Sequence, residues 1–196
     1  MTSARRGVPL LETERLVLTI PQREAAPRLH AYARDNRERL APWEPPYADD
    51  YFTESYWKRR LELDRDEYAR DVSMRLCIFE KGAALGPVVG RANFSNIVRS
   101  AFQACTLGYS LDARAEGKGY MTEALGAAIA HAFGALGLHR VMANYMPINE
   151  RSGLLLRRLG FVVEGYARDY LYIGDGWKDH VLTALTSPSA PPPTSR

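Results

Sequence analysis

The chain has 196 residues, of which 46% are hydrophobic, and its formal net charge is +3. This length fits one domain with a buried core. No apolar run is long enough to span a membrane, and the small net charge does not by itself argue for a nucleic-acid partner. The first seven residues lack the apolar region of a signal peptide, so we expect a cytoplasmic protein.

The first half of the chain predicts strands and helices separated by clear breaks. Alternation over residues 15–20 predicts a strand, and three prolines at Pro42, Pro45 and Pro46 force a loop. The remaining elements predicted here are helices at residues 23–40 and 53–69 and strands at residues 73–79 and 88–98. Cys77 and Cys105 fall in apolar runs, so buried free thiols are expected. Without CxxC or paired-His spacing, no metal site is expected.

The second half begins with a predicted strand at residues 102–111. A stripe at 3.6-residue spacing then predicts a helix over residues 121–136. A strand at residues 141–146, a helix at 149–159 and a final hairpin of residues 161–173 and 177–186 follow. Strands with helices on both faces predict an α+β fold built on a mixed sheet.

The stretch at residues 114–122 joins the strand to the long helix and contains Gly117 and Gly119. Glycines at a helix start allow close backbone approach to a ligand, and the free N–H groups there favour an anion such as pyrophosphate. A P-loop spacing is absent, and a dinucleotide fingerprint would need glycine where Thr122 stands. What remains is Arg-x-x-Gly-x-Gly, beginning at Arg114. Alone, this motif also fits an ordinary glycine-rich turn.

A second motif follows further along the chain. Asn149 is a suitable N-cap for a short helix that has an apolar face, and Gly160 with Phe161 is typical of a helix end. The order of glycine loop, helix, strand, capped helix and Leu-Gly-Phe resembles the GCN5-related N-acetyltransferases. Within that family, five blocks resemble the RimJ-type branch, which acetylates the N-terminal alanine of a ribosomal protein. The blocks are residues 11–18, 42–45, 92–96, 139–147 and 177–186.

The resemblance covers residues 11–186 as one acetyltransferase domain. It leaves an N-terminal segment, residues 1–10, and a Pro-rich tail, residues 187–196, which we expect to be flexible. It implies a mostly antiparallel sheet with a central, splayed parallel pair of strands, one ending near Tyr109 and the other at residues 141–145.

Acetyl-CoA is the implied cosubstrate, with its pantetheine arm in the gap between the parallel strands. The implied coenzyme-binding residues are Leu107, Gly108, Tyr109, Arg114, Gly117, Lys118, Gly119, Tyr120, Met121, Thr122, Asn149 and Ser152. A backbone N–H near Leu107 or Gly108 would polarise the thioester carbonyl for direct attack by an amine.

Three residues are candidates for catalysis. Ser152 is the candidate donor to the leaving thiolate, although it could equally be a capping residue of the helix. Tyr145 is the rival donor, with a buried core tyrosine as the alternative. Glu44 is the candidate base, and a solvated loop carboxylate is its alternative. Related enzymes can carry a glutamate where residues 168–171 have none, so Asp169 is a weaker substitute. Glu116 is expected to be simply exposed.

Acidic residues gather near aromatic ones in the proline-rich loop. Their negative charge would attract the positively charged N-terminus of a peptide substrate. The acidic residues are Glu44, Asp49, Asp50 and Glu54, and the aromatic ones are Trp43, Tyr47, Tyr51 and Phe52. A plain solvated acidic loop is the alternative.

The function implied by the resemblance is acetylation of the N-terminal alanine of small-subunit ribosomal protein number five. This function allows a transient contact with the ribosome or its precursor and needs neither a membrane nor specific DNA. One alternative is acetylation of another protein or a small amine. The other is a non-catalytic ribosome-assembly factor that holds RNA with Arg140, Arg151, Arg157, Arg158 and Arg168.

Overall fold

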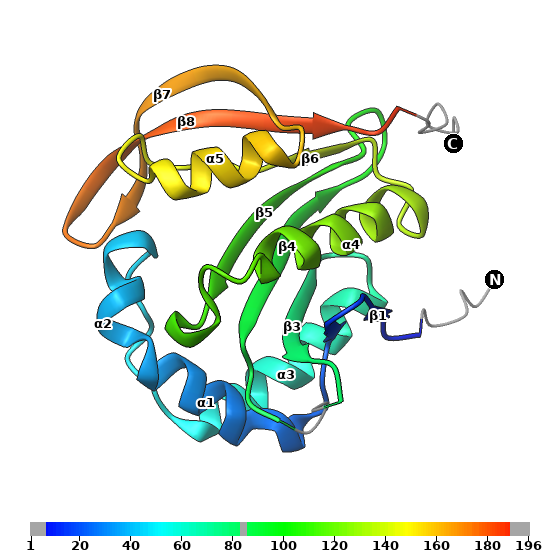
Figure 1. Cartoon of the computed structure of the whole chain (residues 1–196), viewed down its shortest axis with the longest axis vertical. Helices are drawn as coiled ribbons and strands as arrows, with labels where there is room; N and C mark the ends of the chain where they lie inside the picture. Colours follow the sequence, from blue (N-terminus) through cyan, green and yellow to red (C-terminus); the bar gives the residue numbers. More distant parts are fainter. Residues whose placement is uncertain (1–6, 83–85, 189–196) are drawn as a thin grey trace.

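The computed structural model describes residues 7–82 and 86–188 and shows one twisted sheet with helices on both faces (Figure 1). The eight strands lie in the order β1-β2-β3-β4-β5-β6-β8-β7, and β5 with β6 is the parallel pair. The strands are β1 (Leu10–Glu12), β2 (Leu16–Thr19), β3 (Met74–Glu80), β4 (Gly90–Val98), β5 (Ala104–Leu111), β6 (Arg140–Met142), β7 (Val162–Ile173) and β8 (Gly176–Thr186). The predicted mixed α+β fold is confirmed.

The helices divide between the two faces because side chains alternate along each strand. Ala92 and Phe94 of β4 pack with α4 in the larger buried cluster, whereas Cys77 and Phe79 of β3 pack with α1 and α3 in the second one. The helices are α1 (Ala26–Asp35), α2 (Arg37–Leu40), α3 (Glu54–Ala69), α4 (Tyr120–Gly134) and α5 (Glu150–Arg158), with short 3-10 turns η1 (Arg23–Ala25), η2 (Ala41–Trp43) and η3 (Ala113–Ala115). Cys77 and Cys105 are buried and free, as expected.

The prediction of one helix over residues 23–40 is wrong. The chain breaks at Asn36, which has φ −107° and ψ 4° and separates α1 from α2. Its amide Nδ2 donates to the Tyr32 carbonyl and to Asp112 Oδ2, both at 3.0 Å. An asparagine side chain that bonds to nearby backbone competes with helix continuation. The break therefore anchors the α1–α2 junction to the segment that follows β5.

The predicted strand at residues 141–146 is also too long. It pairs with β5 only over Ala104↔Arg140, Cys105↔Val141 and Thr106↔Met142, and β6 ends there. The following backbone stays beside β8, with which β6 already pairs, since the N–H groups of Ala143 and Tyr145 donate to the Thr183 and Val181 carbonyls at 3.0 and 3.2 Å. Beyond Thr106, β5 continues to pair with β4, whereas the chain that follows β6 no longer pairs with β5. The expected splay between the two parallel strands is therefore present.

The chain ends show two further differences. β1 was not predicted and pairs antiparallel with β2 around a turn at Thr13. Ser187 was expected to belong to the flexible tail, but it is buried, and its N–H donates to the His139 carbonyl at 2.8 Å. Residues 1–6 of the predicted N-terminal segment and 189–196 of the tail lie outside the described residues. Over the ranges that are described, none of the helices has the length and apolarity needed to cross a bilayer.

Candidate active site

The glycine loop joins β5 to α4 in the predicted manner. Gly117 and Gly119 have φ of +74° and +78°, the left-handed region that favours glycine, and α4 begins immediately afterwards. The N–H groups of Tyr120, Met121 and Thr122 lie in the first helical turn, where the helix itself offers them no acceptor. The side chain of Met121 is buried in the core, and the Tyr120 hydroxyl donates to Glu80 Oε1 at 2.9 Å. Both residues therefore offer a ligand their backbone rather than their side chains.

Arg15 braces this loop, and sequence reasoning missed it. Its guanidinium pairs with Glu123 in the first turn of α4 at 2.6 Å and donates to the Lys118 carbonyl at 2.9 Å. Thr13 Oγ1 also donates to Glu123 at 2.6 Å. Burial acts to raise the pKa of Glu123, but hydrogen bonds from Thr13 and Arg15 outweigh it and hold the pKa below its ordinary value. The sequence offers one signal for this contact: Glu123 is an acidic residue next to a predicted anion site, where a compensating cation would be needed.

Glu116 is not simply exposed, so that expectation is wrong. Its carboxylate pairs with Arg39 of α2 at 2.7 Å and with Arg151 of α5 at 2.9 Å. The two arginines compensate its charge and connect the glycine loop with helices on both sides of it. An acidic residue in a loop suited to an anion is thus neutralised by two cations.

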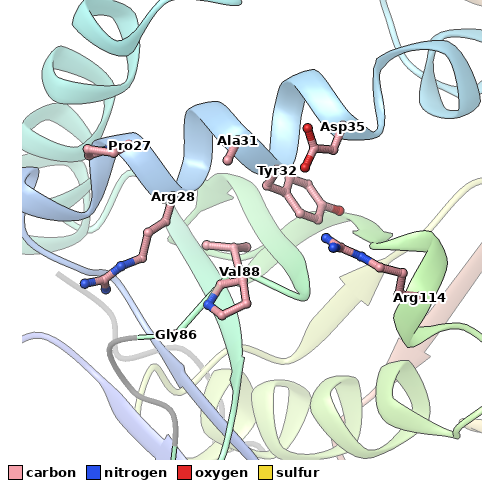
Figure 2. Close-up of a pocket in the computed structure, with 9 residues that line it drawn as sticks. Pro27, Arg28, Ala31, Tyr32, Asp35, Gly86, Val88 and Arg114 are labelled. Atoms are coloured by element: carbon pink, nitrogen blue, oxygen red, sulfur yellow. The ribbon is translucent and has the colours of Figure 1, made fainter.

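The Arg114 side chain extends towards α1. It pairs with Asp112 at 2.9 Å and lines a cavity of about 410 Å³ together with Tyr32 and Asp35 (Figure 2). Hydrogen bonds from Arg114, opposed by burial and supplemented by Asn36, hold the pKa of Asp112 well below its usual range. Among the described residues that line this cavity, Arg114 is the single member of the glycine loop.

Three hydroxyl-bearing residues meet across the splay. The hydroxyls of Tyr109 on β5 and Ser152 in α5 share a hydrogen bond of 2.6 Å. The Tyr145 ring lies against Gly153, where an added Cβ would stand 2.9 to 3.0 Å from the ring end. Asn149 caps α5 as predicted, because its Oδ1 accepts from the Ser152 N–H at 3.1 Å. Ser152, Tyr145 and Asn149, which the sequence singled out, are therefore brought together.

The β5 edge beside this cluster is open. Gly108 is exposed, and a Cβ added there would meet nothing within 4 Å, whereas Leu107 is buried in the core. A cavity of about 260 Å³ lies next to Tyr145 and Gly153, and Pro147, Glu150, Leu154 and Arg157 complete its lining. An extended ligand can therefore approach the backbone of residues 107–109 as an added strand would.

Glu44 lies in an aromatic setting at the end of η2. Its Oε2 accepts a hydrogen bond from the Tyr47 hydroxyl at 2.8 Å, and Tyr47 stacks on Tyr51 with ring centroids 4.4 Å apart. Burial and then the charge of Glu44 raise the pKa of Tyr47. Burial raises the pKa of Tyr32, with a smaller contribution from the charge of Glu44, and the Tyr32 hydroxyl donates to Ser110 on β5 at 2.9 Å. The hydrogen bond from Tyr32 joins α1 to the strand that carries Gly108 and Tyr109.

The rest of the predicted acidic rim is partly neutralised. Asp50 pairs with Arg59, and Glu54 pairs with Lys58 at 2.6 Å. Asp169, the substitute base, is exposed, and its N–H donates to Asp179 at 2.9 Å. Among the described residues, no group of three or more His, Cys, Asp or Glu side chains could hold a metal ion.

Comparison with known proteins agrees with this geometry. The sequence profile of the acetyltransferase (GNAT) domain matches residues 15–162. The [ribosomal protein uS5]-alanine N-acetyltransferase of Escherichia coli K12 is 45% identical over 194 residues, covering 98% of this chain and 99% of that protein.

Two solved structures are also similar. The ribosomal-protein-S5-alanine acetyltransferase of Vibrio fischeri has a TM-score of 0.89 at 36% identity and covers 94% of this chain and 100% of its own. Mycobacterium smegmatis RimJ in complex with CoA-disulfide has a TM-score of 0.82 at 26% identity, with coverage of 93% and 90%. The chain therefore belongs to the GNAT family of acetyltransferases.

Proposed function

We propose that the chain transfers the acetyl group of acetyl-CoA to the α-amine of the N-terminal alanine of ribosomal protein uS5. The observation that carries this proposal is the divergence of β5 from β6 after Thr106, between the glycine loop and the hydroxyls of Tyr109 and Ser152. The 45% identity to the uS5-alanine enzyme of Escherichia coli over nearly the whole chain supports the acceptor. The reaction takes place in the cytoplasm, with a transient contact to the ribosome or its precursor.

The residues present fit acetyl-CoA. The N–H groups of Gly119, Tyr120, Met121 and Thr122 would hold the pyrophosphate, since two left-handed glycines bring the backbone to the helix start. The open edge at residues 107–109 would hold the pantetheine arm, with Asn149 and Ser152 on its other side. When bound, acetyl-CoA supplies an acyl group activated as a thioester. The proposal involves no metal.

The chain's own groups then have three tasks. A backbone N–H at Leu107 or Gly108 polarises the acyl carbonyl as a fixed dipole. Ser152 donates a hydrogen bond to the sulfur as negative charge develops there. Glu44, directly or through water, takes the proton that the amine loses. An α-amine has a pKa of about 7.7–8.0, against about 10.4 for lysine, so roughly a tenth is neutral at pH 7 and a weak base suffices.

The alternative of an RNA-binding assembly factor has less support. Arg140 already pairs with Glu164, and Arg151 pairs with Glu116. Acetylation of another protein or a small amine would use the same coenzyme site, so only the acceptor distinguishes it.

The test is an acetylation assay, read by mass spectrometry, on a peptide that copies the alanine-initiated start of uS5. We expect rapid modification of its α-amine and far slower modification of the same peptide with a blocked N-terminus and a free lysine. Glu44→Gln should slow the reaction most at low pH, where little amine is neutral. Glu62→Gln, which changes an exposed carboxylate of α3 paired with Arg23, is its control and should leave the rate unchanged. Equal rates on both peptides, or activity confined to small amines, would refute the acceptor.

A further inference from the structure

We propose that Tyr109 is a positioning residue for the departure of the thiolate. Its phenol donates to Ser152 Oγ and thereby directs the hydrogen of Ser152 towards the sulfur of CoA. The inference rests on the proposed function but concerns the coenzyme side of the site and not the acceptor.

The geometry places this pair at the reacting end of the splay. Tyr109 is on β5, Ser152 is in the first turn of α5, and their hydroxyl oxygens are 2.6 Å apart although the residues are 43 positions apart in the chain. Because β5 pairs with β6 only as far as Thr106, the bond spans the gap that opens beyond that residue. Both side chains are partly buried, so water competes little for either hydroxyl.

The Ser152 hydroxyl is not needed to cap its helix. Asn149 performs that task, since its side chain accepts from the Ser152 backbone N–H at 3.1 Å. The Ser152 hydroxyl instead contacts Tyr109. A hydroxyl has one hydrogen to donate, so its direction depends on which neighbour accepts and which donates.

Tyr109 is the better donor of the two. A phenol is more acidic than an aliphatic alcohol, and burial raises the pKa of Tyr109 to about 12, so the phenol keeps its proton at neutral pH. With Tyr109 donating, Ser152 accepts on its oxygen and its own hydrogen is left for another acceptor. Hydrogen bonds in such a chain polarise one another, which strengthens the bond that Ser152 donates.

This arrangement balances the reaction without ionising Ser152. The carbon–nitrogen bond forms as the carbon–sulfur bond breaks, and the electron pair of the broken bond stays on sulfur. Ser152 stabilises that charge by a hydrogen bond, and water supplies the final proton to the thiolate. The proton lost by the amine goes to Glu44 or water. A thiol, with a pKa of about 8.5, is a stronger acid than either hydroxyl, so hydrogen bonding rather than proton transfer is the role of the pair.

Binding of free CoA tests the inference without turnover. Calorimetry at pH 7 and pH 9.5 compares CoA with desulfo-CoA, which has no thiol. Between pH 7 and pH 9.5 the thiol of CoA becomes a thiolate. Over this range we expect the affinity of the wild type for CoA to rise about fivefold relative to its affinity for desulfo-CoA. Tyr109→Phe and Ser152→Ala should lose most of that gain. Tyr166→Phe, which removes an exposed hydroxyl bonded to Asp179, is the matched control and should keep it.

Kinetics supply a second readout. Tyr109→Phe should lower kcat about fivefold with little change in the KM for acetyl-CoA. The double variant with Ser152→Ala should be no slower than Ser152→Ala alone, because Tyr109 acts only through Ser152. The inference would be overturned if Tyr109→Phe kept the full gain in CoA affinity, or if Tyr145→Phe lost it instead. It would also be overturned if the reductions in kcat from Tyr109→Phe and Ser152→Ala were additive in the double variant. A wild type that binds CoA but does not modify the uS5 peptide would refute only the proposed acceptor.

Discussion

Arg15 and Glu123 form an ion pair of 2.6 Å that joins two segments 108 residues apart in the chain. Arg15 precedes β2, and Glu123 lies in the first turn of α4, directly after the glycine loop. The pair holds the helix start against the sheet. It also neutralises a carboxylate that would otherwise oppose an anion bound at the helix N-terminus.

Arg15→Ala should weaken CoA binding about fivefold while changing stability little. The affinity falls because Glu123 is left uncompensated and the Lys118 carbonyl loses its donor. The stability changes by less than about 1 kcal/mol, since the Arg15 side chain is 44% exposed. Calorimetry and thermal melting measure the two effects. Arg23→Ala, which breaks the exposed pair with Glu62, is the control and should leave CoA affinity unchanged.

Gly119→Ala should reduce CoA affinity by an order of magnitude or more. The residue has φ +78°, so any side chain strains the loop and stands where backbone must approach pyrophosphate. Gly137→Ala imposes a similar left-handed strain, of about 1–2 kcal/mol, at φ +65° in the turn after α4. Equal affinity losses in the two variants, measured by calorimetry, would show that strain rather than ligand contact is responsible.

Gly153→Ala should lower kcat while the protein stays folded. The new Cβ would lie 2.9 Å from the Tyr145 ring, and the ring, at the free end of its side chain, must move away. Gly126→Ala is the matched helical control, because nothing lies within 4 Å of its added Cβ. That change should raise stability by about 0.5–1 kcal/mol and leave the rate unaltered. An unimpaired rate in Gly153→Ala would remove Tyr145 from the site.

Asp112→Asn should destabilise the protein at pH 7, because it weakens charge-assisted hydrogen bonds to Arg114. The folded-state pKa of Asp112 is depressed, so its contribution is fully present above the ordinary carboxyl pKa of about 3.9 and is lost as pH falls towards the folded value. Urea unfolding of both proteins should therefore show a large difference at pH 7 that shrinks below about pH 4. A difference independent of pH would contradict this linkage.

Features that depend on neighbouring residues were predicted best. The helix after the glycine loop has a regular apolar stripe, and α5 carries its own cap at Asn149. Gly160, with φ +90°, ends α5, and the Phe161 N–H returns to the Leu156 carbonyl at 3.0 Å. Each of these signals lies within a few residues of the structure that it predicts.

Features made by distant side chains were not predictable. Asn36, where α1 ends, donates to Asp112, and Glu116 is neutralised from α2 and α5. Nothing near Asn36 or Glu116 in the sequence identifies these partners. The same holds for the bond between Tyr109 and Ser152, because the sequence placed both residues at the site without indicating that their hydroxyls meet.

Because β6 is short, its pairing with β5 is a suitable place at which to divide the protein. Three register pairs join β5 to β6, and the turn at Gly137 lies just before them. A chain cut at this turn would yield two fragments, one with the glycine loop and the other with α5 and the β7–β8 hairpin (Figure 1). Acetyl-CoA bound between them would contact both fragments and stabilise their association. Reassembly of the split protein would then report the coenzyme concentration. The short β5–β6 pairing is therefore a starting point for a biosensor.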